Sequence, residues 1–259
     1  MPEAKEKTEL DSNIHISVRG LHKSWEDNHV LRGIDLDILR GKKNIIIGGS
    51  GAGKTVLMRQ IVVLDRPDKG SIKIDNVEIT NLSEAKLSEI RARFGMVFQL
   101  SALFDSMSVF DNVAFPLREQ GGLSNKEIRT RVMDKLEALN VADAAKRIPG
   151  DISGGMKKRV AVARALVREP EILIYDEPTA GLDPIGARNV DRLILEMDDL
   201  FDVTSIVITH DMATCIDVGD RVSMIDSGII HTTCKPRELA LSDDSVVRNF
   251  VEASGVKRD

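Results

Sequence analysis

The sequence predicts an α/β fold with a mainly parallel central sheet, and three observations support this prediction. Short, nearly all-apolar segments of strand length recur along the chain, and segments with apolar residues at helical spacing separate them. Strands that are apolar throughout are typical of sheets covered on both faces, and their alternation with helices favours parallel pairing. Between residues 100 and 168, helix signals occur without a convincing strand, which indicates a helical insertion.

The elements follow one another in a regular order. Ser124 and Glu127 form a capping box before one helix, a second helix is predicted over Gly154–Val167, and a third starts at Pro184 with Asp183 as its N-cap. The candidate strands are Ile14–Val18, Asn44–Ile47, Ile72–Ile74, Phe94–Phe98, Ile172–Tyr175, Ser205–Thr209 and Arg221–Ile225.

These elements predict a single folded domain over residues 14–259, preceded by a flexible tail of residues 1–13. Residues 14–99 and 169–235 would form the α/β core. Residues 100–168 would form the helical insertion, and residues 236–259 a helical segment at the C-terminus.

Composition excludes several classes of protein. The 259 residues include 42% hydrophobic side chains, and no apolar run reaches the roughly 18–20 residues that span a bilayer. The N-terminus is polar and lacks the apolar core of a secretory signal. A net charge of −5 disfavours a general nucleic-acid binder. Cys215 and Cys234 show no metal-binding spacing, so we expect free thiols in a reducing compartment.

A glycine-rich segment between a predicted strand and a predicted helix matches the pattern G-x-x-x-x-G-K-[ST]. Glycines let backbone N–H groups converge on phosphates, and the helix dipole favours the same anion. Lys54 would reach the β- and γ-phosphates of a nucleotide, and the hydroxyl of Thr55 would bind Mg²⁺. The alternative is a glycine-rich turn that binds no nucleotide. The segment consists of Gly48, Gly49, Ser50, Gly51, Ala52, Gly53, Lys54 and Thr55.

A second signal is the apolar strand that ends in Asp176 and Glu177. Such a strand delivers carboxylates to the carboxyl edge of the sheet, where α/β folds bind ligands. Asp176 would support Mg²⁺, and Glu177 would polarise the attacking water. A strand that ends in Asp-Glu is common, and the phosphate loop gives this one its significance.

With Ser153, Gly154 and Gly155, the chain resembles the ATP-binding-cassette (ABC) ATPases, whose signature LSGGQ it matches except at Ile152 and Met156. Other motifs of that family appear in the expected order. They are an aromatic residue before the phosphate loop (Trp25), a glutamine after a strand (Gln99), a D-loop (Ala180–Asp183) and a switch histidine (His210).

The resemblance implies a P-loop NTPase (RecA-like) core with an antiparallel β subdomain and an inserted helical subdomain. It also implies ATP and Mg²⁺ as cofactors and a head-to-tail homodimer. In that dimer Ser153, Gly154, Gly155 and Asp183 would complete the site of the partner chain. Lys54, Glu177 and His210 would carry out catalysis.

Three further roles are implied by the same resemblance. Gln99 would bind Mg²⁺ together with Thr55 and Asp176, or be a polar residue at a strand end. Trp25 would stack on adenine, or be a packing anchor. Gly49 replaces a common proline of the loop and Met156 replaces the signature glutamine. Neither change touches a residue assigned to the reaction.

A narrower resemblance concerns residues 99–119 and Met156, which are similar to the ATPases of bacterial Mla/Mce-type phospholipid transporters. It implies a membrane permease docking near Gln99–Arg118, an Mce-domain lipid-binding protein and, in some systems, a small STAS-domain regulatory subunit. It places the protein at the cytoplasmic face of the bacterial inner membrane, trafficking phospholipids between inner and outer membranes to maintain outer-membrane lipid asymmetry.

Three alternatives stay open at this point. The chain could serve an importer of another small substrate, such as an amino acid. It could be a non-transport ABC ATPase in DNA repair, although its acidic balance opposes nucleic acid as a partner. It could also be a scaffold that binds ATP without hydrolysing it, which the presence of both Glu177 and His210 opposes.

Overall fold

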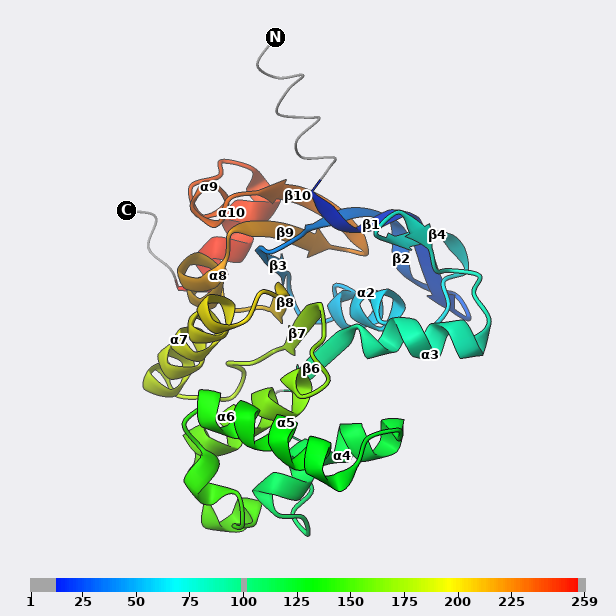
Figure 1. Cartoon of the computed structure of the whole chain (residues 1–259). Helices are drawn as coiled ribbons and strands as arrows, with labels where there is room; N and C mark the ends of the chain where they lie inside the picture. Colours follow the sequence, from blue (N-terminus) through cyan, green and yellow to red (C-terminus); the bar gives the residue numbers. More distant parts are fainter. Residues whose placement is uncertain (1–12, 99–101, 256–259) are drawn as a thin grey trace.

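The computed structural model describes residues 13–98 and 102–255 and contains two β-sheets (Figure 1). The central six-stranded sheet has the order β10-β9-β3-β8-β7-β6, and only its edge pair β10 and β9 is antiparallel. In chain order its strands are β3 (Lys43–Ile47), β6 (Phe94–Phe98), β7 (Ile172–Asp176), β8 (Thr204–Thr209), β9 (Arg221–Asp226) and β10 (Ile229–Cys234).

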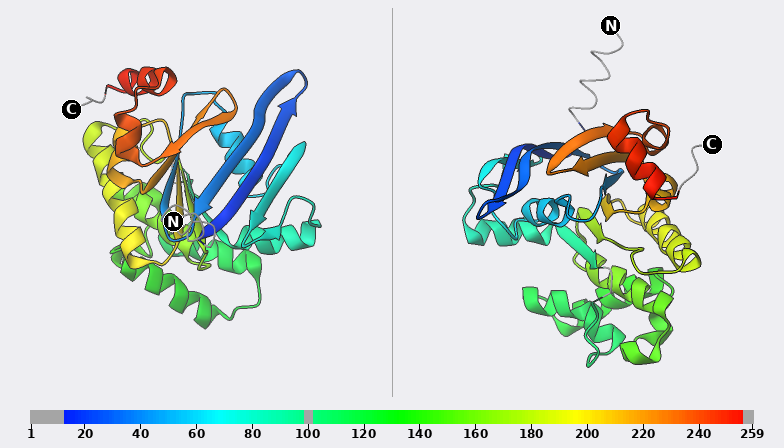
Figure 2. Two further views of the ribbon diagram at one scale, coloured as in Figure 1. Left: turned by 90° about the horizontal axis from the view of Figure 1, so that it is seen from above. Right: turned by 180° about the vertical axis from the view of Figure 1, so that it is seen from behind.

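The second sheet is antiparallel and has the order β2-β1-β4-β5. Figure 2 shows it standing beside the central sheet, with α2 between the two. Its strands are β1 (Ile14–Trp25), β2 (Asn28–Leu39), β4 (Lys69–Ile74) and β5 (Val77–Glu78).

The helices form three groups around the sheets. One group consists of α2 (Lys54–Ile61), which lies between the sheets, and α3 (Glu84–Ala92), which lies below α2 in Figure 1. A helical layer occupies the chain between β6 and β7: α4 (Val109–Gln120), α5 (Asn125–Ala138), the 3₁₀ turns η1 (Ala142–Ala144) and η2 (Pro149–Asp151), and α6 (Gly154–Leu166). The last group covers the other side of the sheet: α7 (Pro184–Leu200), α8 (Met212–Val218), α9 (Pro236–Ala240) and α10 (Ser245–Ala253).

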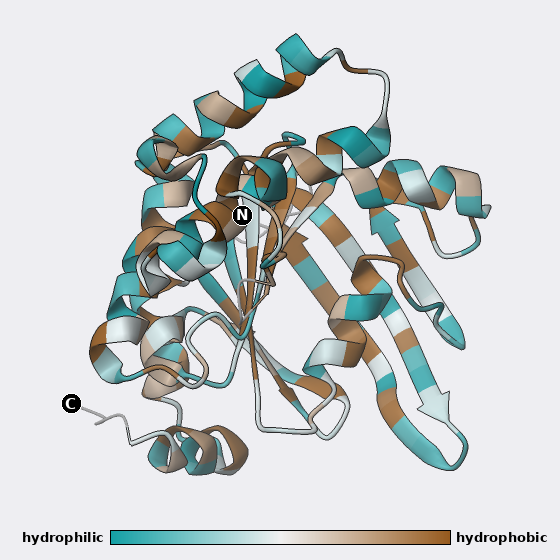
Figure 3. Ribbon diagram, turned by 90° about the horizontal axis from the view of Figure 1, so that it is seen from below, coloured by the Kyte–Doolittle hydropathy of each residue, from teal (hydrophilic) through white to brown (hydrophobic). Residues whose placement is uncertain are grey.

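Alternating side chains of the central strands divide the apolar core in two. Ile45 and Ile47 of β3 pack with the helical layer, α7 and α8, whereas Ile46 packs with α2 and the antiparallel sheet. In β7, Tyr175 faces the first core and Ile174 the second. Because successive residues of a strand point to opposite faces, a sheet covered on both sides needs strands that are apolar throughout. Figure 3 shows this concentration of apolar residues on the central strands.

The structure confirms the predicted fold class, and most predicted elements agree closely with it. β6 has the predicted bounds, and α6 and α7 begin at the predicted residues. The capping box of Ser124 and Glu127 is present at the start of α5, and Asp183 caps α7. Three strands are missing from the prediction, β2, β5 and β10, and β1 extends well beyond Val18. The predicted tail, apart from Asn13, lies outside the described residues.

Within residues 13–98 and 102–255, no helix combines the length and the apolar content that crossing a bilayer requires.

Candidate functional site

The phosphate loop joins the end of β3 to the start of α2 at the carboxyl edge of the central sheet. Two of its glycines are required by their surroundings. Gly53 has φ 107° at the N-cap of α2, a conformation that other residues rarely adopt. A Cβ on Gly48 would lie 2.3 Å from the carbonyl oxygen of Ile225. At Gly49 a Cβ would meet no atom within 4 Å, so this position does not need glycine for space.

Lys54 is buried directly behind this loop, with 7% of its surface exposed. Its Nζ donates hydrogen bonds to the carbonyl oxygens of Gly48, at 2.9 Å, and Gly49, at 3.1 Å. The same Nζ lies 3.3 Å from Oε1 of Glu177. The ammonium group is therefore held between the loop and the end of β7.

Glu177 follows β7 in a conformation that is rare for a side-chain-bearing residue. Its φ of 47° lies in the left-handed region, which costs energy and occurs preferentially at functional sites. Its N–H donates to the carbonyl oxygen of Ile208 at 2.8 Å, which ties the residue to β8. The strained backbone turns the carboxylate toward the phosphate loop.

His210 directly follows β8 and lies on the other side of the same carboxylate. Its Nδ1 is 2.8 Å from Oε2 of Glu177, and 54% of its side chain is exposed. Lys54, Glu177 and His210 thus form one row of contacts, although they come from three different elements. The structure brings together all three residues that the sequence analysis assigned to catalysis.

Asp176 and Thr55 are the described residues that could hold a magnesium ion. Burial and the neighbouring charge of Glu177 raise the pKa of Asp176, while Lys54 opposes this shift. Oδ1 of Asp176 is buried and finds no hydrogen-bond partner among the described residues, and Thr55 is exposed at the start of α2. Hard oxygen ligands of this kind suit Mg²⁺. Gln99, the third predicted ligand, lies outside the described residues.

The signature residues begin α6 in the helical layer, which Figure 1 shows apart from α2. Ser153 is the N-cap, and its Oγ accepts a hydrogen bond from the N–H of Met156 at 3.3 Å. Gly154 and Gly155 are exposed, and a Cβ on either would meet no atom within 4 Å. As the first residues of α6, they have N–H groups with no acceptor within the helix, as an anion site at a helix N-terminus requires. They line a cleft of about 430 Å³ between α6 and α7.

Asp183 and Trp25 are both exposed at the surface. Asp183 caps α7 and accepts a hydrogen bond from the N–H of Gly186 at 2.8 Å. Trp25, 47% exposed, ends β1 beside the turn into β2, and Nζ of Lys23 lies 5.4 Å from its ring centre. A Cβ on Gly53 would lie 3.3 Å from the carbonyl oxygen of Val30, so β2 passes directly beside the phosphate loop. The hairpin of β1 and β2, which carries Trp25 at its turn, therefore lies next to the phosphate loop.

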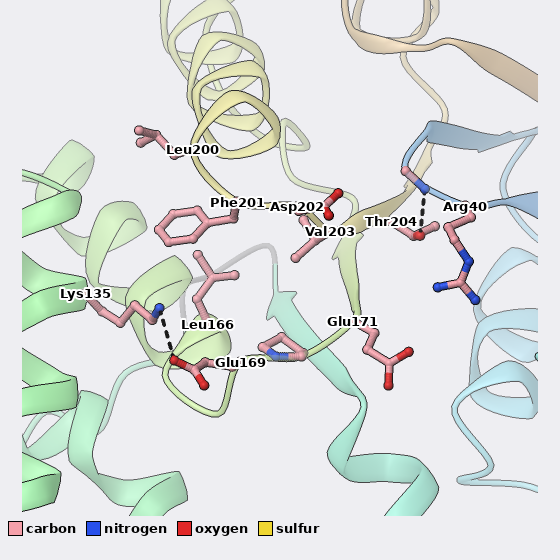
Figure 4. Close-up of a pocket in the computed structure, with 12 residues that line it drawn as sticks. Arg40, Lys135, Leu166, Glu169, Glu171, Leu200, Phe201, Asp202, Val203 and Thr204 are labelled. Carbon is pink, nitrogen blue, oxygen red and sulfur yellow. Dashed lines mark hydrogen bonds and ion pairs between the residues drawn. The ribbon is translucent and has the colours of Figure 1, made fainter.

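A second cleft, of about 420 Å³, lies at the opposite edge of the central sheet, where β7 and β8 begin (Figure 4). Lys135 lies 3.9 Å from Glu169 across it, and Thr204 accepts a hydrogen bond from the N–H of Gly41. Because parallel strands end together, this cleft is distinct from the phosphate-loop edge.

Next to this cleft, ligand atoms of His15, Asp75 and Glu171 lie within 4.8 Å of one another, as a metal site would require. Arg93 pairs with both carboxylates, and Arg40 pairs with Asp75. The two guanidinium charges already neutralise the two carboxylates. This cluster is therefore an ion-pair network rather than a metal centre.

One group of charged residues was missed by the sequence analysis. Arg188 on α7 contacts Asp191 and two carboxylates of the α8 region, Asp211 and Asp217. The available signals were the helical i,i+3 spacing of Arg188 and Asp191 and the position of Asp211 directly after His210.

Comparisons with known proteins agree with this geometry. A family model described as "ABC transporter" matches residues 31–180. Two relatives are intermembrane phospholipid transport system ATP-binding proteins MlaF. The protein of Haemophilus influenzae is 37% identical over 92% of this chain and 90% of its own length. That of Escherichia coli is 39% identical over 85% and 81%.

Other relatives carry other names. A probable ribonucleotide transport ATP-binding protein, mkl of Mycobacterium leprae, is 41% identical over 93% of this chain and 70% of its own length. The methionine import protein MetN of Carboxydothermus hydrogenoformans is 41% identical over 82% and 64%.

Solved structures of related proteins share the fold over most of the chain. cbiO1 of Clostridium perfringens, part of the ABC transporter complex cbiONQ, has a TM-score of 0.82 and 34% identity over 92% of this chain and 94% of its own. The dimeric bacterial cassette MJ0796 has a TM-score of 0.73 and 30% identity over 85% and 98%. The chain therefore belongs to the ABC transporter family and is one of its ATP-hydrolysing cassettes.

Proposed function

We propose that the chain hydrolyses ATP at the row formed by Lys54, Glu177 and His210. This row carries the proposal because it places a cation, a carboxylate and an imidazole in contact at the end of the phosphate loop. Glu177 polarises the attacking water and accepts its proton. Lys54 and His210 stabilise the charge of the transferring phosphate.

The reaction is ATP plus water to ADP plus inorganic phosphate, and it needs positioning and charge stabilisation more than covalent chemistry. The rigid attachment of Glu177 to β8 through its N–H bond to Ile208 serves positioning. Mg²⁺, when held by Asp176, Thr55 and Gln99, neutralises phosphate charge. The burial and unpaired Oδ1 of Asp176 support this assignment.

We propose that the working unit is a head-to-tail homodimer. Gly154 and Gly155 are exposed at the start of α6, where N–H groups suit a phosphate, yet they lie in the helical layer and not in the Lys54–Glu177–His210 row. A second copy of the chain would bring its signature to the phosphate loop. The printed description of MJ0796 as a dimeric cassette supports this arrangement for a related protein.

The permease would dock where β6 leads into the helical layer. Phe98 is 43% and Phe104 42% exposed, and both line a cleft of about 340 Å³ together with Phe115 and Pro116. Exposed aromatic side chains next to a cleft are typical of protein–protein contacts. Of the predicted Gln99–Arg118 region, residues 99–101 lie outside the described residues.

The proposed role is phospholipid trafficking between the inner and outer membranes, from the cytoplasmic face of the bacterial inner membrane. The likeness to two MlaF proteins and the similarity of residues 99–119 to that group support it. An Mce-domain protein and a STAS-domain subunit would be further partners. The second candidate is import of another small substrate, which the 41% identity to mkl and MetN favours.

The test is purification of the tagged full chain with its membrane partners, followed by reconstitution into vesicles. ATP-dependent transfer of a fluorescent phospholipid to acceptor vesicles would support lipid trafficking, with the Glu177→Gln variant as the inactive control. Uptake of methionine or a ribonucleotide without lipid transfer would refute it and favour the second candidate. Co-purification of DNA and no permease would refute both.

A further inference from the structure

The cluster around Arg188 joins two helices that begin at functional loops. α7 begins directly after the Ala180–Asp183 loop, and α8 begins two residues after His210, with Asp211 between them as its N-cap. The guanidinium of Arg188 lies 2.9 Å from Oδ2 of Asp191 and 3.4 Å from Oδ2 of Asp211, and it also contacts Asp217. One cation therefore serves three carboxylates from both helices.

Asp211 is the member of this cluster that is nearest to the catalytic row. Its Oδ1 accepts a hydrogen bond from the N–H of Ala213 at 2.8 Å and so caps α8. Its Oδ2 faces Arg188 and accepts a hydrogen bond from Oγ1 of Thr214 at 3.0 Å. Because Asp211 directly follows His210 in the chain, its position constrains the backbone that carries the imidazole.

A second contact links the N-terminal cap of α8 to the segment that follows Glu177. The hydroxyl of Thr214 lies 3.4 Å from the hydroxyl of Thr179, and both residues are buried. Thr179 is two residues beyond Glu177 in the chain. The cap of α8 is thus attached to the loops of both His210 and Glu177, and Arg188 attaches it in turn to α7.

We propose that Arg188 is a positioning residue for ATP hydrolysis. Its contacts with Asp211 and Asp217 hold the start of α7, which follows the Ala180–Asp183 loop, against the N-terminal cap of α8. This attachment keeps Glu177 and His210 in contact. This inference rests on the assignment of Glu177 and His210 to catalysis proposed above.

The charges in the cluster explain why the guanidinium matters. Burial raises the pKa of Asp191 to about 6, although Arg188 opposes the shift. Asp211 and Asp217 face the same region, and Lys158 of α6 is a second cation that interacts with Asp191. Without Arg188, three carboxylates would face one another. Their repulsion would move the start of α8 away from α7.

The test compares Arg188→Ala with Arg188→Lys in the full chain, measuring phosphate release and the binding of a fluorescent ATP analogue. We expect kcat to fall roughly 10-fold in the alanine variant, since misplacement by about 1 Å costs up to about 100-fold. KM for ATP and the stoichiometry of analogue binding should stay unchanged, because the phosphate loop is not part of the cluster. Lysine should restore part of kcat.

Two variants separate this role from general stability. Asp198→Asn removes the charge that pairs with Lys43 at 2.7 Å near the far end of α7, and should lower stability without lowering kcat per binding-competent site. Asp211→Asn keeps the helix-capping oxygen but loses the charge that faces Arg188, and should reproduce the kcat loss if Arg188→Ala does not fold.

A kcat per binding site equal to that of the parent, in Arg188→Ala or in Asp211→Asn, would overturn the proposal. Equal kcat losses in Asp198→Asn and Arg188→Ala would do the same. Glu177→Gln, measured in parallel, identifies the cause of a failure. If Glu177→Gln hydrolyses ATP like the parent, the catalytic assignment is wrong. If it is inactive while Arg188→Ala is normal, only the positioning role is wrong.

Discussion

Replacement of Glu177 by glutamine is the sharpest test of the catalytic assignment, because it changes charge and almost nothing in shape. In the structure, the carboxylate contacts Nζ of Lys54 at 3.3 Å and Nδ1 of His210 at 2.8 Å. Glutamine can fill the same space and still hydrogen-bond to both groups. It cannot accept a proton from water.

Two effects of opposite direction follow from these contacts. Loss of a positioned base should lower turnover by about 100- to 10,000-fold. ATP affinity should rise, because an incoming phosphate no longer competes with Glu177 for Lys54. At 3.3 Å the gross attraction of such a pair is about 5 kcal/mol with an effective dielectric constant near 20. Since phosphates replace most of it, we expect a net gain of about 1.4 kcal/mol, which is tenfold in affinity.

Phosphate release, titration with a fluorescent ATP analogue and size-exclusion chromatography with ATP measure the three consequences of this variant. We expect slow release, tighter binding and an ATP-dependent dimer. Glu171→Gln is the matched control, because Glu171 precedes the same strand at its opposite end and pairs there with Arg93. Turnover of Glu177→Gln at the parent rate would refute the assignment, and weaker ATP binding would refute the proposed competition for Lys54.

Three further predictions concern the same region. Gly48→Ala should lose about 1–3 kcal/mol of stability and much of its ATP binding, because the Cβ would clash with Ile225. Gly49→Ala, at an open position, should change neither stability nor ATP binding. Thermal unfolding and ATP titration compare the two variants. Asp191→Asn should be more stable than the parent at pH 8 by up to about 3 kcal/mol, since the pKa is raised from 3.8 to about 6. This gain in stability should shrink as the pH falls through about 6, because Asp191 of the folded parent then takes up a proton. Urea unfolding at several pH values measures the gain, and a gain independent of pH would contradict the reasoning. Asp183→Ala should cost about 1 kcal/mol as a lost helix cap, and Asp183→Asn much less, in the same unfolding assay.

The sequence predicted five of the six strands of the central sheet, because those strands are largely apolar, whereas the edge strand β10 has no buried residue and was missed. β6 has the predicted bounds, and β7 and β8 each extend by one residue. The antiparallel sheet was predicted poorly. β2 alternates buried and solvent-facing residues, as Ile34, Leu36 and Ile38 do with the aspartates between them. Such strands contain no continuous apolar run, and β1 was therefore predicted only up to Val18.

Motifs located the candidate site more reliably than they described its contacts. The phosphate loop and the signature are visible in the sequence as short runs of glycine, although the structure requires glycine clearly at Gly48 and Gly53 and leaves open space at Gly154 and Gly155. The contact of Lys54 with Glu177 and that of Arg188 with Asp211 depend on how β7, β8 and α7 pack in three dimensions. No local pattern encodes such contacts, so they became apparent only in the folded chain.

The positions of the two anion-binding segments explain why one chain is insufficient. The phosphate loop lies at the carboxyl edge of the sheet, whereas the N-terminus of α6 lies in the helical layer. α7 packs beside both α6 and α8: Arg159 of α6 pairs with Glu196, and Arg188 pairs with Asp211. A partner chain that contacts the Ala180–Asp183 loop would therefore act on α7. This helix is joined by ion pairs to α6 and to Asp211, the N-cap of α8 that follows His210. If hydrolysis uses Glu177 and His210 in contact, as proposed, closure of a dimer and alignment of these two residues would be a single event.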